Sequence, residues 1–202
     1  MPRVLLEASM SLDGFVEDDR GGGFDRLFAW YGNGDVEIRT ADPGLTFRVS
    51  AASADRVREM DRVGALVVGR KAFDYTGGWN GRHPVDVPVF VLTHRVPEDW
   101  VSAHPDAPFT FVTSGGAAEV VRRAVEAAGD RDVAVGPGEV AGAVLDAGLL
   151  DEVRINLVPL WLGAGKPLFG RPATVPATFG TPTVVEGDGV THLTYRVPSG
   201  RA

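Results

Sequence analysis

The sequence predicts an α/β protein with a mainly parallel mixed sheet that ends in an antiparallel hairpin. Short apolar, β-branched runs alternate with segments of helical spacing along most of the 202 residues, which is typical of parallel strands joined by helices. The last two apolar runs are separated only by a short glycine-containing turn, which predicts an antiparallel pair. With 44% hydrophobic and 23% charged residues, the chain can bury one full core, and we expect a single domain over residues 1–202.

The elements of the first half follow from apolar spacing and turn residues. Residues 3–8 are an apolar run suited to a buried strand, and residues 9–23 read as a loop. Phe24, Leu27, Phe28 and Tyr31 fall on one face of a helix predicted over residues 24–31. The remaining expectations are a mobile, glycine-broken insertion over residues 32–43, a helix capped by Ser53 that runs to Arg62, a strand over 65–68, and a short helix opened by Gly69.

The second half continues the alternation. Residues 88–93 and 109–113 are β-branched or aromatic runs bounded by turn residues, and residues 114–128 have helical apolar spacing. The stretch 132–145, DVAVGPGEVAGAVL, reads as a strand, a tight turn and a helix. A strand over 153–158 follows, and residues 183–186 and 190–197 are expected to pair across a turn at 187–189.

Composition excludes several classes of function. The chain has no cysteine, which rules out disulfides, thiolate metal sites and a cysteine nucleophile. Its formal net charge of −7 argues against nucleic-acid binding, because phosphate backbones require clustered cations. No apolar run approaches the roughly 20 residues of a membrane helix, and the amino end lacks the pattern of a signal peptide. His83, His104 and His192 show no ligand spacing, so we expect no metal. Together, the missing cysteines and membrane segments lead us to expect no membrane contact and a cytoplasmic protein.

The glycine turn at Gly136, Pro137 and Gly138 is a candidate phosphate cradle. A helix N-terminus carries unpaired N–H groups and partial positive charge, and a strand that enters it through glycines lets a phosphate approach the backbone. Pro137 stands where no backbone donor is needed. The alternative is a plain connection, since glycine and proline are ordinary turn residues.

Two earlier strand ends also carry groups compatible with phosphate. Arg70 and Lys71 follow Gly69 in the first helical turn, where cations oppose the helix dipole unless an anion is bound. Alternatively, both side chains extend into solvent. Thr93, His94 and Arg95 follow the next strand and supply a hydroxyl, an imidazole and a guanidinium. Because the carboxyl ends of parallel strands share one edge, the three segments could serve one long ligand.

These segments resemble a known superfamily of reductases. GRK after one strand, THR after the next and VGPGEV before a helix are similar, in the same order, to the cofactor-binding segments of the dihydrofolate reductase superfamily. The stretch LLEASMSLDGFVE resembles its first strand and loop. Together with LLDEVRINLVPLWLGAGKPLF, it is most similar to the branch that contains the carboxyl-terminal reductase domain of bifunctional riboflavin-biosynthesis proteins. The likeness covers residues 3–169 and implies a dihydrofolate reductase-like three-layer fold with helices on both faces of the sheet.

The resemblance implies NADPH as cofactor and assigns its contacts. Gly69, Arg70 and Lys71 would lie near cofactor phosphates, and Thr93, His94 and Arg95 near the adenosine 2′-phosphate. The pyrophosphate would sit on Gly136, Pro137, Gly138, Glu139 and Val140, while Ala8 and Val16 would border the nicotinamide.

Three positions depart from the family patterns. Leu27 stands where dihydrofolate reductases carry an acid that binds the pterin, and Asp25 is the nearest acid. Ala134 stands in place of a substrate-contacting glutamate of the riboflavin-type reductases, and Ala72 in place of their threonine. The sequence therefore leaves the substrate unassigned.

Substrate contacts are expected mainly in the first loop and helix. Ser9 and Ser11 lie where substrate-facing hydroxyls would be expected, and Trp30 could stack on a flat heterocycle, although each could equally serve the core. Asp13 and Asp25 are the candidate catalytic acids, but an aspartate before glycine is also a common turn former.

The predicted function is an NADPH-dependent reductase of a small heterocyclic substrate, resembling 5-amino-6-(5-phosphoribosylamino)uracil reductase. Two alternatives stay open: a dihydrofolate reductase-type activity, and a non-catalytic nucleotide- or ligand-binding protein on the same fold. The exposed edge of the terminal hairpin also suggests a symmetric homodimer.

Overall fold

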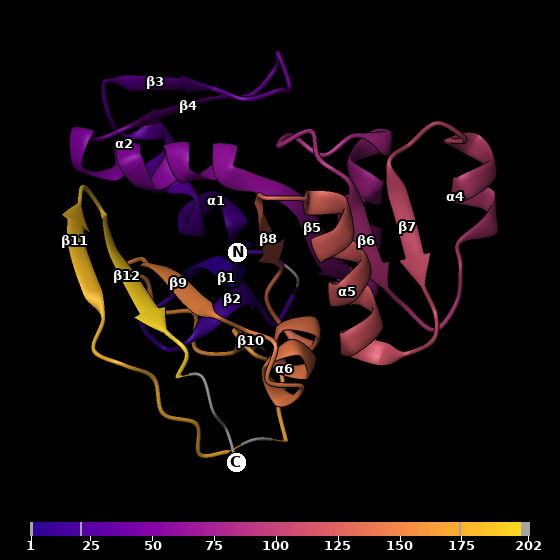
Figure 1. The fold of residues 1–202 in the computed structure, drawn as a ribbon. Coiled ribbons are helices and arrows are strands. Elements are labelled where there is room, and N and C mark those ends of the chain that lie inside the picture. The colour runs from indigo at the N-terminus through magenta and orange to yellow at the C-terminus, as the bar shows by residue number, and fades with distance from the viewer. Residues whose placement is uncertain (1, 21, 174, 199–202) are drawn as a thin grey trace.

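The computed structural model describes residues 2–20, 22–173 and 175–198, and its centre is an eight-stranded mixed sheet (Figure 1). Six neighbouring strands run parallel, and the terminal hairpin adds two antiparallel strands at one edge. The predicted fold class is confirmed. In spatial order the strands are β11 (Thr183–Gly187), β12 (Val190–Arg196), β9 (Glu152–Leu157), β1 (Val4–Met10), β8 (Asp132–Val135), β5 (Val63–Gly69), β6 (Val89–Leu92) and β7 (Phe109–Val112).

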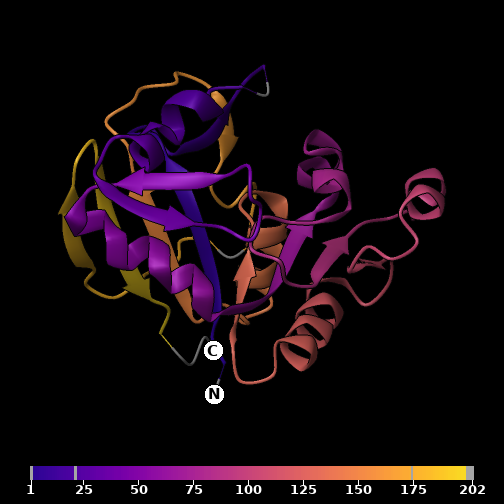
Figure 2. The same ribbon diagram turned by 90° about the horizontal axis from the view of Figure 1, so that it is seen from above.

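Helices cover both faces of the sheet, because side chains along a buried strand alternate between its faces. In β5, Ala65 and Val67 pack in one cluster with α5 (Gly116–Ala128) and α6 (Glu139–Asp146), whereas Val68 packs with Phe73 of α3 (Arg70–Tyr75). Figure 2 shows α2 (Ala51–Arg58) at one end of the sheet and α4 (Glu98–Ala103), which the sequence did not predict, beyond β7 at the other. None of the described helices has the length and hydrophobicity to span a bilayer.

The helix expected over residues 24–31 is broken. It consists of α1 (Phe24–Leu27) and the 3₁₀ turn η1 (Ala29–Gly32), with non-helical backbone at Phe28. The rings of Phe24, Phe28 and Tyr31 still follow one another, with neighbouring centroids 6.1 and 5.8 Å apart, whereas Leu27 points into the core. Leu27 and Trp30 are buried, while Phe28 is 42% exposed.

Two segments predicted as loops contain strands. The expected mobile insertion at residues 32–43 includes β3 (Val36–Arg39), which pairs with β4 (Thr46–Val49). Val36 and Ile38 alternate with charged residues as in a half-buried strand, a pattern that the surrounding glycines obscured. The first loop likewise contains β2 (Phe15–Asp18), which pairs with β10 (Gly165–Pro167).

The predicted cap of α2 was wrong by three residues. Ser50 is the N-cap, and its hydroxyl accepts a hydrogen bond from the backbone of Ser53 at 3.3 Å. The helix ends at Arg58 and continues as the 3₁₀ turn η2 (Glu59–Arg62). Ser53 is instead part of a buried polar network, in which its Oγ lies 2.8 Å from His192 Nε2 and His192 Nδ1 lies 2.7 Å from Asn156 Oδ1.

Burial of His192 predicts a loss of stability in acid. Burial, with a contribution from Arg56, lowers the pKa of His192 from 6.5 to about 4. The unfolded chain therefore takes up this proton at a higher pH than the folded chain, and the free energy of unfolding should fall by about 3 kcal/mol as the pH drops from 7 to 4. We expect His192→Gln to lower stability at pH 7 but to flatten this dependence, measured by urea unfolding across the pH range. An unchanged slope would exclude His192 as its source.

Candidate functional site

The carboxyl ends of four neighbouring parallel strands, β8, β5, β6 and β7, surround a cavity of about 580 Å³. In an open α/β sheet this edge is where ligands bind. The structure thus brings together the three segments that the sequence analysis singled out, together with a fourth. The lining comes from residues 69–72 after β5, 92–94 after β6, 113–116 after β7, and Pro137, Glu139 and Val140 after β8.

Arg70 connects the first two strand ends. Its Nη1 donates to the backbone oxygen of Arg95 at 2.7 Å and lies 3.4 Å from Thr93 Oγ1. Its Nε donates to Asp74 at 2.7 Å, one helical turn further along α3. These contacts orient the guanidinium at the junction of the two segments, so one of the two candidate cations does not simply extend into solvent.

The cavity is rich in cations although the chain as a whole is acidic. Arg70, Lys71 and Lys166 line it, against a single carboxylate, Glu139, among the described lining residues. Lys166 reaches the cavity from β10, and its nearest acidic partner, Glu17, is 3.8 Å away. Cations gathered in a concave site attract anions even when the net charge is −7. The arrangement therefore suits a phosphate-bearing ligand.

Glycines allow a second chain segment to pack against the turn at the start of α6. Gly138 has φ +93°, and its N–H donates to the backbone oxygen of Leu168 at 2.7 Å. A Cβ on Gly138 would lie 2.3 Å from Lys166 Cε, so the lysine stem crosses directly over the turn. A Cβ on Gly142 would lie 2.3 Å from the backbone oxygen of Phe169. The glycines therefore serve chain packing as well as any phosphate.

Several predicted cofactor residues lie around the cavity rather than on its wall. Gly136 and Gly138 are in the turn behind Pro137, and Arg95 is exposed beside His94. The two residues expected near the nicotinamide, Ala8 on β1 and Val16 on β2, are buried and belong to the same hydrophobic cluster as Val140.

The side chains predicted to contact the substrate, Ser9, Ser11 and Trp30, form hydrogen bonds within the protein instead. Trp30 is 2% exposed, and its indole N–H donates to Ser9 Oγ at 3.0 Å. Ser11 is fully buried; its hydroxyl lies 2.6 Å from Asp13 Oδ1 and accepts from the backbone of Phe15. In this structure these side chains hold the first loop and the core together.

The two candidate acids do not line the cavity. Asp13 receives backbone hydrogen bonds from Leu162 and Gly163, at 3.2 and 2.6 Å. Desolvation raises the pKa of Asp13, but the hydrogen bonds from Ser11 and from these two amides outweigh it and lower the pKa below its ordinary value. Asp13 thus remains a carboxylate that ties two loops together, and Asp25 is exposed in the first turn of α1.

Part of the cavity wall was not predicted from the sequence. The turn after β7, with Thr113, Ser114, Gly115 and Gly116, repeats the pattern of a strand, glycines and a helix, which could have identified it. Lys166 had no comparable local signal, because only the pairing of β10 with β2 brings it to the turn before α6.

Comparison with known families agrees with this geometry. Residues 2–179 match the family model of the RibD C-terminal domain. The chain belongs to the RibD C-terminal domain family. The reductase resemblance read from the sequence is therefore confirmed at the level of the family.

Solved structures show the same fold. A putative riboflavin biosynthesis protein from Shewanella sp. PV-4 is 26% identical, with a TM-score of 0.67 over 97% of this chain and 99% of that one. A diaminohydroxyphosphoribosylaminopyrimidine deaminase/5-amino-6-(5-phosphoribosylamino)uracil reductase from Thermotoga maritima is 18% identical, with a TM-score of 0.59 over 98% of this chain and 57% of that one. Dihydrofolate reductase from Enterococcus faecalis is 14% identical, with a TM-score of 0.54 over 96% and 95% of the two chains. These neighbours confirm a dihydrofolate reductase-like fold.

The close approach at Gly142 predicts a specific loss of stability. A methyl group there would displace the backbone oxygen of Phe169, and Gly142→Ala should lower the free energy of unfolding by about 1–3 kcal/mol in urea titrations. Gly32→Ala is the matched control, because a Cβ at Gly32 meets nothing within 4 Å. Equal stability of the two variants would show that Phe169 is not packed against α6 as described.

Proposed function

We propose that the protein is an NADPH-dependent reductase of a small heterocyclic substrate. The observation that carries the proposal is a cation-lined cavity shared by four parallel strand ends. A dinucleotide phosphate has phosphate groups at separate points, and this edge offers separate groups to receive them. Membership of the RibD C-terminal domain family supports a reductase of this type.

The residues present fit such a cofactor. Arg70, Lys71 and Arg95 are the candidates for the 2′-phosphate, together with the Thr93 hydroxyl and His94. The N-terminal amides of α6 and the ammonium group of Lys166 would hold the pyrophosphate, since the lysine stem already crosses the turn at Gly138. Ala8 and Val16 supply an apolar neighbourhood for the nicotinamide. When bound, NADPH would supply a hydride, and the protein contributes binding, orientation and exclusion of water.

The Thermotoga neighbour named as a uracil reductase suggests the type of substrate. We propose that the reaction resembles that of 5-amino-6-(5-phosphoribosylamino)uracil reductase in reducing a small heterocycle. Ala134 and Ala72 leave room for a different substrate, because both lack the polar groups of the riboflavin-type enzymes.

The cofactor assignment predicts that the chain distinguishes NADPH from NADH. NADPH should quench tryptophan fluorescence and raise the melting temperature more than NADH or AMP does. Arg95→Ala should weaken NADPH binding about tenfold or more, because it removes a charged hydrogen bond to the 2′-phosphate, and should leave NADH binding almost unchanged. Arg48→Ala, at another exposed arginine that does not line the cavity, is the control.

The same titrations separate binding from catalysis. If NADPH binds no better than NADH or AMP, the proposed function fails. If NADPH binds selectively but is not oxidised with any of a panel of pterins, pyrimidines and quinones, the chain is a nucleotide-binding protein on this fold and the reductase proposal is rejected.

We also propose a symmetric homodimer through the edge strand β11. This strand ends the sheet, and Val184 and Val185 are 52% and 41% exposed along it. Unprotected edges of this kind pair readily with a second chain. Sedimentation should give twice the 21.4 kDa chain mass, and Val184→Lys should yield monomers, whereas Thr181→Lys, just before the strand, should not. A monomeric parent protein, or a dimer that survives Val184→Lys, would contradict this interface.

A further inference from the structure

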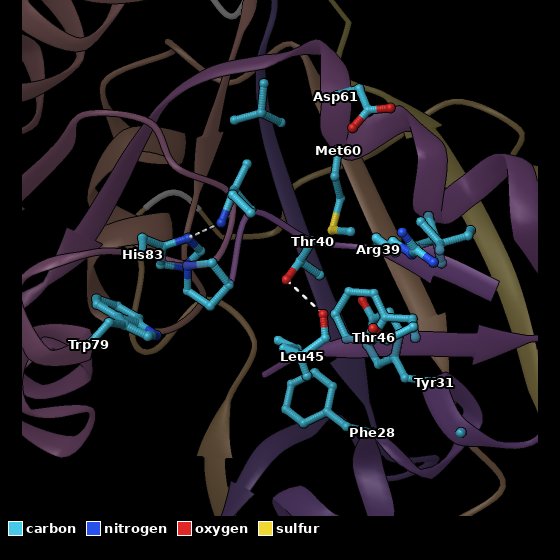
Figure 3. Close-up of a pocket in the computed structure, with 18 of the residues that line it drawn as sticks. Phe28, Tyr31, Arg39, Thr40, Leu45, Thr46, Met60, Asp61, Trp79 and His83 are labelled. Atoms are coloured by element: carbon cyan, nitrogen blue, oxygen red, sulfur yellow. Dashed lines mark hydrogen bonds between the residues drawn. The ribbon is translucent and has the colours of Figure 1, made fainter. Parts of the chain in front are cut away.

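A second and larger cavity lies apart from the cofactor cavity. Its volume is about 820 Å³, and the β3–β4 hairpin, the end of α2 with η2, the 3₁₀ turn η3 (Gly77–Gly81) and residues 83–85 surround it. Figure 3 shows Met60 entering from one side, Trp79 and His83 from another, and Phe28, Tyr31 and Leu45 from below. A volume of this size is typical of small-molecule sites.

The walls of this cavity are mainly apolar and aromatic. Tyr31 stands between two other rings, with centroids 3.9 Å from Trp30 and 4.4 Å from Phe47. Trp79 packs edge-on against His83 at 4.6 Å. Two rings inclined by 30°, Tyr31 and Phe47, on one wall and an indole on the other suit a flat ring system, because stacking and edge contacts stabilise it.

His83 brings a polar group to this wall without a charge. Its Nδ1 accepts a hydrogen bond from the backbone of Val85 at 3.1 Å, which leaves the proton on Nε2. Burial lowers the pKa of His83 to about 4, so the imidazole is neutral at pH 7. It can donate one hydrogen bond but cannot neutralise a phosphate.

The charged groups of this cavity stand at its rim or are already engaged. The side chain of Arg39 is 86% exposed and pairs with Glu37 at 3.5 Å. The guanidinium of Arg131, an exposed residue, donates to the backbone oxygen of Val63 at 3.2 Å, and Asp61 adds a negative charge. The cofactor cavity has three cations and one carboxylate among its described lining residues, and of these cations Arg70 is paired with Asp74 at 2.7 Å. A phosphate placed in the second cavity would lose its hydration without a dedicated partner, which is costly.

Two elements connect the cavities. Arg70 and Lys71 begin α3 in the cofactor cavity, and η3, which follows α3, brings Trp79 to the second cavity. On the other side, α1 contacts β2, which carries Val16, and η1 brings Tyr31 to the second cavity. The second cavity therefore shares these elements with the cofactor region, while Val63 and Arg131, at the amino ends of β5 and β8, form its far wall.

From this arrangement we infer that the second cavity is the substrate chamber and that it takes a flat, uncharged aromatic or heteroaromatic molecule without a phosphate group. The inference rests on the proposed function for its catalytic meaning. The proposed ligand differs from a phosphoribosylated substrate, because the chamber would recognise it by ring stacking and one neutral hydrogen-bond donor, without an ion pair. The aromatic pair Tyr31 and Phe47 forms one face of the chamber and Trp79 the other.

The test uses 1-naphthol and 1-naphthyl phosphate, which differ only in the phosphate. Calorimetric titrations are run with and without saturating NADPH, so that the cofactor cavity cannot capture the phosphate ester unnoticed. Naphthol should bind, and the ester should bind at least about tenfold more weakly. Met60→Trp enlarges a side chain that already enters the chamber, and it should weaken naphthol about tenfold while leaving NADPH affinity unchanged. Arg58→Trp, at an exposed residue two positions earlier and outside the chamber, should leave both affinities unchanged.

The outcomes separate this inference from the proposed function. The inference is overturned if neither naphthalene binds, if the ester binds as tightly as naphthol in the presence of NADPH, or if Met60→Trp has no effect. Naphthol binding that responds to Met60→Trp, in a protein that does not bind NADPH, supports the chamber but rejects the reductase. NADPH binding without naphthol binding rejects the chamber and leaves the cofactor assignment intact.

Discussion

The common direction of β8, β5, β6 and β7 is the constraint on which the rest of the site depends. Helical connections enforce this direction, and every carboxyl end therefore opens at the same edge of the sheet. Side chains that are far apart in the chain, such as Arg70 and Lys166, meet there around one cavity. The cationic lining of the cavity thus arises partly from topology, which adds Lys166 to Arg70 and Lys71.

We propose that the two cavities divide recognition between charge and shape. In the cofactor cavity, cations and helix N-termini line one space, and glycines let the 165–170 segment pack over the turn before α6. In the second cavity, stacked rings and a neutral histidine replace those charges. Because α3–η3 contributes to both, a bound cofactor and a bound substrate would each contact the same segment. This shared support is how the fold would hold two reactants in a fixed geometry.

The sheet and three of the four strand ends were predictable because their signals are local: an apolar run, a glycine and the start of a helix. The second cavity was not, since its walls come from η1, β4, η2 and η3, which meet only after folding. The β3–β4 hairpin that closes it was hidden by glycines and polar residues around a short alternation at Val36 and Ile38. Tertiary contacts also gave some residues a different role from the one predicted. Ser9 and Trp30, expected to contact the substrate, are hydrogen-bonded to each other in the core.

The central claim is that one dinucleotide spans the carboxyl ends of these strands. A crystal structure of the complex with NADPH tests it most directly. The account predicts the 2′-phosphate beside Arg70, Thr93 and Arg95, and the pyrophosphate at the start of α6 within reach of Lys166. It also predicts that the nicotinamide points toward Val16 and the second cavity. Phosphates bound at any other edge of the sheet, or a nicotinamide directed away from that cavity, would contradict it.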